Sequence, residues 1–101
     1  MPGIHEPYGY PYETVAASQT AQALGTTGAT GDYLHRMIVS VATAATGTVT
    51  LLDNATSIVI TAANTPVGVY VVDFGILSAS GAWKVTTGAG ATVIAVGKFS
   101  A

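Results

Sequence analysis

The sequence predicts an all-β protein: a single antiparallel β-sandwich, jelly-roll-like or Ig-like, with an extended N-terminal arm. Short runs of alternating apolar and polar residues follow one another, separated by turns rich in Gly, Asn and Asp. This pattern is typical of half-buried strands in a sandwich or small barrel. No segment carries the apolar stripe of an amphipathic helix. The opening of the chain has a composition of its own, which indicates an arm.

The arm is expected over residues 1–14 and the sandwich over residues 15–101. The first twelve residues, MPGIHEPYGYPY, hold three of the four prolines and three of the five tyrosines. Because proline fixes φ and lacks an amide hydrogen, this stretch fits neither an ordinary helix nor a central strand. Tyrosine combines an apolar ring with a polar hydroxyl and is enriched at interfaces. The arm residues predicted to bind a partner are Tyr8, Tyr10, Pro11 and Tyr12.

In the first half of the domain, residues 14–24 are expected to form one or two edge strands, with a short helix as the alternative. Residues 25–32 (GTTGATGD) are expected to form a loop. Tyr33–Val41 alternates and predicts a strand. One face of this strand is expected to carry His35, Met37, Val39 and Val41, and the other Leu34, Arg36, Ile38 and Ser40.

In the second half, residues 47–61 predict a hairpin, because two alternating runs flank the turn sequence DNA. After a turn at residues 64–66 comes the most hydrophobic strand, residues 67–77 (VGVYVVDFGIL), in which Gly75 is expected to introduce a bend or bulge. Residues 82–86 and 92–99 are expected to form a second hairpin around residues 87–91. The threonines that alternate with the apolar rows predict a sheet with one face in water.

Composition restricts the classes of partner. The 101 residues make one domain. Charged residues are only 8% of the chain, against about 25% in a typical soluble domain, so much of the surface is expected to be covered in an oligomer or on a larger partner. With a net charge of −2 there is no basic footprint for nucleic acid and no polybasic membrane surface, and neither partner is expected. The absence of cysteine excludes a disulfide framework.

No catalytic residue, cofactor site or metal site is predicted, and the chain is not expected to be an enzyme. Asp32 and His35 would face opposite sides of a strand and would form no dyad. Asp32 and Asp53 are interpreted as turn caps, since no acidic loop has the spacing of a Ca²⁺ site. The glycine-rich loop lacks the Lys-Ser/Thr of a phosphate loop. Trp83 is expected in the core, with stacking on a sugar ring as the functional alternative.

Asp73 differs from the other acidic residues because it interrupts an apolar strand, VYVVDFGI. A charge in such a strand is expected to be paired, or to lie at an edge or an interface. Arg36 and Lys84 are the candidate partners. An ion pair within the chain and a pair across a subunit boundary are both open at this point.

Two stretches carry a family resemblance. Residues 17–39 (ASQTAQALGTTGATGDYLHRMIV) and residues 80–99 (SGAWKVTTGAGATVIAVGKF) resemble small virion proteins of tailed bacteriophages. The resemblance implies a β-sandwich module without enzymatic residues. Some proteins of this kind are capsid decoration (cement) proteins that sit as trimers on the shell, and others are tail, fibre or baseplate components.

The function expected from these observations is that of a decoration protein on the exterior of the capsid. It would be a homotrimer that binds the major capsid protein, and it would stabilise the shell by binding only the assembled form. The alternative is a tail, fibre or baseplate module that binds a receptor or carbohydrate. That alternative predicts an exposed Trp83 or Tyr70 beside polar groups.

Overall fold

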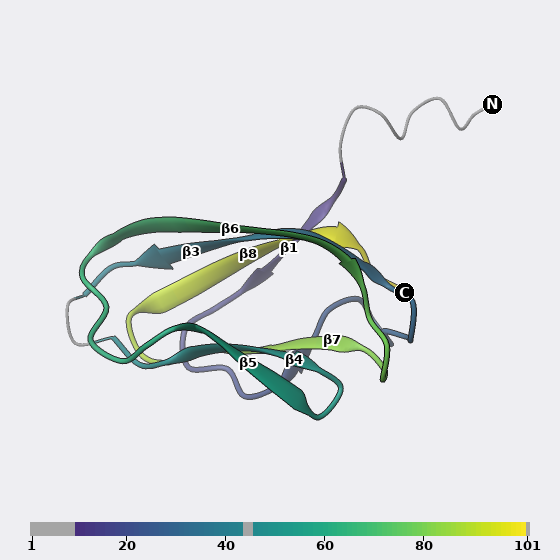
Figure 1. Cartoon of the computed structure of the whole chain (residues 1–101). Coiled ribbons are helices and arrows are strands. Elements are labelled where there is room, and N and C mark those ends of the chain that lie inside the picture. The colour runs from purple at the N-terminus through teal and green to yellow at the C-terminus, as the bar shows by residue number, and fades with distance from the viewer. Residues whose placement is uncertain (1–9, 44–45, 101) are drawn as a thin grey trace.

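The computed structural model describes residues 10–43 and 46–100 of the chain. Within these ranges the protein forms eight strands and no helix, arranged as two four-stranded antiparallel sheets packed face to face (Figure 1). The predicted all-β sandwich is confirmed. Among the described residues there is no helix of the length and apolar character that a membrane crossing requires.

The order of the strands identifies the topology. Sheet A contains, in order, β1 (Tyr12–Val15), β8 (Ala91–Lys98), β3 (Tyr33–Val41) and β6 (Gly68–Leu77). Sheet B contains, in order, β2 (Gln22–Ala23), β7 (Trp83–Thr86), β4 (Val49–Asp53) and β5 (Thr56–Thr61). Eight strands distributed 1-8-3-6 and 2-7-4-5 over two sheets form a jelly roll. Of the two topologies that the sequence left open, the jelly roll is the one observed.

The domain begins earlier than predicted. β1 pairs with β8 from Tyr12 opposite Val96 to Val15 opposite Val93, so the sheet already includes residues 12–14, which the sequence assigned to the arm. The Glu13 carboxylate fixes this edge by accepting a hydrogen bond from the amide of Gly25 at 2.7 Å. β1 and β2 are the edge strands of their sheets, which confirms the prediction of edge strands over residues 14–24.

The predicted faces of β3 are wrong at its start. Leu34 is buried together with Met37, Val39 and Val41, whereas His35 is not. The register shifts between Leu34 and Arg36 against both neighbouring strands. Such a bulge places one extra residue in the ladder and reverses the alternation beyond it. On β6, Gly75 lies at the same irregularity with a φ of 67°, which confirms the bulge predicted at this glycine.

The hairpin over residues 47–61 is confirmed as β4 and β5, with Asn54 at its tip in the left-handed region. The second predicted hairpin is wrong, because β7 and β8 lie in different sheets. Their apolar rows face each other across the core instead of lying side by side. The connection is held between the sheets by the buried Thr87, whose hydroxyl donates to the carbonyl of Ala16 at 2.6 Å. Alternation alone does not distinguish these two arrangements.

The core fills the space between the two sheets. Trp83 is its largest fully buried side chain, only 2% exposed, and its indole N–H donates to the carbonyl of Asp32 at 2.9 Å. The prediction of a core position for Trp83 is confirmed. The other buried apolar residues are Val15, Leu24, Leu34, Met37, Val39, Val41, Val49, Leu51, Val85, Ala91, Val93 and Ala95.

Candidate interaction surfaces

The predicted partner-binding residues of the arm occupy different environments. Tyr8 lies outside the described residues. The ring of Tyr10 lies 5.1 Å from that of Tyr33 and 5.5 Å from that of His35, measured between ring centroids. The Pro11 carbonyl accepts a hydrogen bond from the amide of Gly97 at 3.0 Å. Tyr10 and Pro11 are therefore held on the domain itself, while Tyr12 is 66% exposed on edge strand β1.

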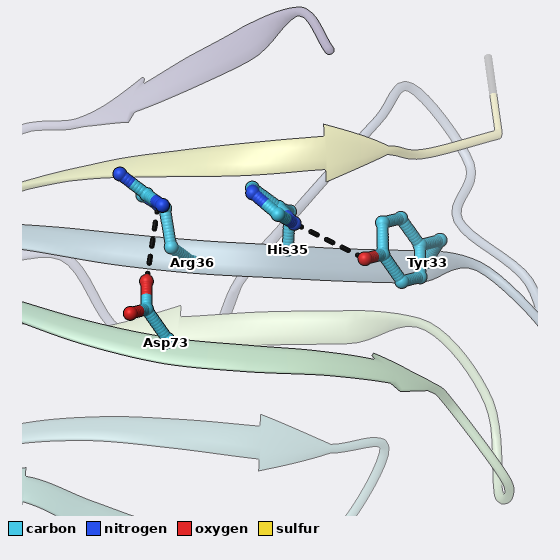
Figure 2. Close-up of polar contacts among 4 residues, drawn as sticks. All are labelled: Tyr33, His35, Arg36 and Asp73. Atoms are coloured by element: carbon cyan, nitrogen blue, oxygen red, sulfur yellow. Dashed lines mark hydrogen bonds and ion pairs between the residues drawn. The ribbon is translucent and has the colours of Figure 1, made fainter. Parts of the chain in front are cut away.

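The aromatic cluster that receives Tyr10 was not predicted. The Tyr33 hydroxyl lies 3.1 Å from Nδ1 of His35, and both residues come from the start of β3 (Figure 2). Their proximity depends on the bulge, which moves His35 off the core face, and a bulge leaves no clear mark in the sequence of β3 itself. The carboxylate of Asp32 is bound elsewhere, to Ala29 and Ser100.

Asp73 is paired within the chain. Its Oδ1 lies 3.1 Å from Nε of Arg36, directly across the β3–β6 ladder (Figure 2). The side chains are 74% and 42% exposed, respectively, so the pair contributes at most about 1 kcal/mol to stability. Lys84 lies on the other sheet, opposite Leu52 and Ala23. The structure therefore brings together Asp73 and Arg36 but not Lys84.

One side of the sandwich collects the exposed apolar side chains. Of the eight large apolar residues that are exposed in the described part of the chain, seven lie on β5, on β6 or immediately before β6. We call this surface the apolar side; it consists of Ile58, Val59, Val67, Val69, Val71, Ile76 and Leu77. β5 and β6 are the last strands of their sheets and lie on the same side of the sandwich (Figure 1).

The position of β6 was not predictable from its composition. A run that is apolar on both faces is typical of a strand covered on both faces, yet the outward-facing Val69 and Val71 of β6 are exposed. The available signal was that Val69 and Val71 alternate with Tyr70 and Val72. In a sandwich with one wet face, the second apolar row has no place in the core, and here it lies on the outside.

The outer faces of the two sheets differ in polarity. On sheet A, Ile38 lies between Ile94 of β8 and Val71 of β6, so an apolar row crosses the centre of the outer face. On sheet B, Thr50 lies opposite Thr86, and Lys84 is the next outward residue of β7. The prediction of a polar outer face in water fits sheet B, but it was wrong for sheet A.

Asp32 caps its own turn, as predicted, whereas the prediction is wrong for Asp53, whose carboxylate bonds a distant loop. The Asp32 carboxylate accepts hydrogen bonds from the amide of Ala29 at 3.0 Å and from the amide and hydroxyl of Ser100 at 2.9 and 2.7 Å. Asp53 accepts from the amides of Ala79 and Ser80 at 2.9 and 3.1 Å. A hollow of about 330 Å³ lies beside Asp32, but the carboxylate in it is already engaged by the chain. Its lining residues are Gly31, Asp32, Tyr33, Lys98, Phe99 and Ser100.

We expect the contacts of Asp32 to make stability depend on acid pH. Burial opposes ionisation, but hydrogen bonds from Ser100 and Ala29 outweigh it and hold the pKa of Asp32 below its usual value. Because the folded-state pKa is depressed, the stabilisation is present above the unfolded-state pKa of about 3.9 and is lost as pH falls through the folded-state value. In thermal melts, the advantage of the native protein over Asp32→Asn should shrink on acidification below about pH 4. A difference that stays constant with pH would contradict this assignment.

Neither of the two residues considered for sugar stacking, Trp83 and Tyr70, is fully exposed. Trp83 is buried in the core, so the alternative role considered for it is wrong. Tyr70 is half-buried, packs against the core and donates its hydroxyl hydrogen to the carbonyl of Pro66 at 2.7 Å.

Two surfaces thus lie at opposite edges of sheet A: the exposed Tyr12 on β1, where the N-terminal segment joins the domain, and the apolar side on β6 and β5. Both surfaces expose large side chains, Tyr12 on β1 and the seven apolar residues on the other. Comparison with known proteins adds no relative: no protein family matches the chain, and no curated protein or solved structure does.

Proposed function

We propose that this chain is a capsid decoration protein of a tailed bacteriophage, which binds the outer surface of the assembled shell as a homotrimer and stabilises it. The observation that carries the proposal is Tyr12, 66% exposed on an edge strand directly after two residues that are fixed to the domain. Large, exposed, positioned tyrosines are the side chains that dominate binding at protein interfaces. The low charge of the chain and the resemblance of residues 17–39 and 80–99 to small virion proteins support the choice of partner.

The jelly roll supports the proposal only by analogy. Viral capsid domains use this architecture, but so do lectins and other proteins, and a fold does not by itself specify a function. Carbohydrate binding is the less favoured use, because the aromatic residues considered for it are engaged within the domain.

Stabilisation of the shell follows from mass action. A protein that binds the assembled shell, but not its separated subunits, shifts the equilibrium towards the assembled form. Three arms on one trimer would act together, since binding of the first raises the effective concentration of the others. The N-terminal segment would attach by adding a strand to an exposed sheet edge of the major capsid protein, with Tyr12 as the anchor next to the domain.

The number of copies in each particle tests the proposal directly. Quantitative mass spectrometry of purified particles from the source should find the protein in a fixed ratio to the major capsid protein, at hundreds of copies per particle, as multivalent coverage of a shell requires. A much smaller number, of the order expected for a tail or fibre, would favour the receptor-binding alternative. Absence from the particle would overturn the virion assignment altogether.

Removal of the N-terminal segment should abolish attachment and leave the domain folded. The deletion must stop at residue 9, because residues 12–15 pair with β8 and Glu13 bonds to Gly25. Tyr12→Ala should weaken binding to shells that lack the protein by about 10- to 100-fold, the usual loss when a central aromatic is truncated. Co-sedimentation with such shells measures this, with Tyr12→Phe as the control that keeps the ring. Full binding by both the deletion and Tyr12→Ala would contradict an attachment through this edge.

A further inference from the structure

The first half of β6, residues 68–72, is an unprotected sheet edge. Within the described residues it pairs with β3 alone, so one row of its N–H and C=O groups faces outward. Natural edge strands are commonly short or carry lysine or proline, which prevents pairing with another chain. β6 is ten residues long and contains neither lysine nor proline, and the charge of Asp73 and the bulge at Gly75 lie only in its second half. β1, the other edge of the same sheet, is four residues long and follows Pro11. The chain thus protects one edge of sheet A and leaves the other open.

From this edge and the apolar side around it, we infer that copies of this chain pack against one another through the apolar side. The inference deepens the proposed function, on which it rests for the homotrimer, but it assigns a surface that can be tested without any shell. It also places self-association and the binding of another partner on different surfaces, because the β1 edge with Tyr12 lies at the opposite edge of sheet A and stays free.

Charge favours a second copy as the occupant. Contact between identical surfaces brings like charges together, so a self-interface needs a neutral surface. Residues 56–61 and 67–77 contain a single charged residue, Asp73, and it is paired with Arg36. The outer face of sheet B carries Lys84 and the β1 edge carries Glu13. Among these surfaces, the apolar side is the one that can face its own copy without repulsion.

Shape points to the same occupant. The apolar side presents two strand edges, β5 and β6, one from each sheet, and packed sheets are about 10 Å apart. A second copy presents the same pair of edges at the same spacing. The apolar sides of three copies can therefore converge around one three-fold axis, where the exposed valines of β6 from each copy come together, as the homotrimer requires; pairing of β6 with β6 edge to edge would instead be a two-fold contact that closes at two copies.

The exposed apolar area reaches the size of a standard interface only where the contact covers Val59 on the outer face of sheet B together with Val69 and Val71 on that of sheet A. Full burial of a Val, Leu or Ile side chain contributes ~1.5–3 kcal/mol. At ~25 cal/mol per Å² of apolar surface, this corresponds to a buried area of roughly 60–120 Å² for each side chain. The seven residues of the apolar side are each 40–65% exposed, so together they offer roughly 200–500 Å² by this estimate. A standard interface buries about 800 Å² per partner, of which about 57% is apolar, or roughly 450 Å².

The oligomeric state of the full chain tests the inference. Sedimentation velocity over a wide range of protein concentration should show an oligomer. Val71→Lys should weaken self-association by about 100-fold, because it places an unpaired charge in the interface. Val71 is 55% exposed and points away from the core, so the melting temperature should change little. Thr14→Lys adds the same charge on the exposed opposite edge and should leave the oligomer intact.

Hydrogen exchange provides a measurement that needs no variant. In the oligomer, the alternate β6 amides that are not bonded to β3 should exchange slowly, and dilution should make them fast. Protection that does not depend on concentration, a monomer at every concentration, or an oligomer that survives both Val71→Lys and Val69→Lys would overturn the inference. An intact oligomer of three copies that fails to bind shells would count against the proposed function alone, and an oligomer of two would change only the number of copies.

Discussion

Replacing Trp83 with alanine is expected to lower the free energy of unfolding by about 3–5 kcal/mol, the usual cost of truncating a buried aromatic in a core. Trp83 is the largest fully buried side chain of the described residues, and its removal leaves a cavity between the sheets. Domains of this kind are stable by only about 5–15 kcal/mol. The variant should therefore be partly or fully unfolded at physiological temperature.

Trp83→Phe separates packing from hydrogen bonding. It keeps an aromatic ring in the core but loses the indole N–H that donates to the carbonyl of Asp32. That carbonyl also accepts a hydrogen bond from the amide of Ser78 at 2.9 Å, so it is not left without a donor. Loss of the indole hydrogen bond should lower the free energy of unfolding by only about 0.5–1.5 kcal/mol. The smaller ring should add a smaller loss of packing energy. Urea unfolding of both variants measures the difference; equal losses would contradict the packing explanation.

Gly97→Ala is expected to destabilise the protein by about 1–3 kcal/mol or more, the range for an overpacked core. A Cβ at this position would lie 2.1 Å from the carbonyl oxygen of Tyr33, which is backbone and cannot rotate away. Gly97 lies opposite Leu34 beside the bulge of β3. The methyl group would therefore force β3 and β8 apart where Tyr33 and His35 are positioned.

The effect of Gly97→Ala should be local as well as energetic. Amides of β3 around residues 33–35 should lose protection from hydrogen exchange before those near Val39. Thr92→Ala, on the outward-facing side of the same strand, is the control and should change the melting temperature only slightly. An unchanged melting temperature for Gly97→Ala would show that the two strands have more room at this point than the structure indicates.

The alternation of apolar and polar residues was sufficient to predict which segments form strands, but not which strands pair with each other. The pattern of Tyr33–Val41 and of residues 47–61 predicts strands that the structure has at both places, although it assigned Leu34 and His35 to the wrong faces. Whether β7 pairs with β8 or faces it across the core depends on contacts far apart in the sequence, such as that of Thr87 with Ala16. The bulge at His35 lies at the same irregularity as Gly75 in another strand, and it shifts the register against β8 as well.

The candidate surfaces were predictable to different degrees. The tyrosine and proline content of the opening predicts Tyr12 as a contact residue, which stays a prediction, but pairing of residues 12–15 with β8 requires the last strand of the domain and leaves no local signal. Asp73 was correctly expected to need a partner, and Arg36 became that partner because the bulge sets the register that places it opposite. The apolar side was missed because composition does not reveal whether a strand is central or at an edge.

The place of β8 has a consequence for synthesis of the protein. β8 is the last strand of the domain in the chain, yet it lies between β1 and β3 in sheet A. While the chain is emerging from the ribosome, β1 has no neighbour and β3 can pair on one side only. Folding must therefore be completed after translation of the domain, and until then long-range strand pairing leaves apolar segments exposed to aggregation. The yield of soluble protein should consequently depend on temperature and on chaperones during expression.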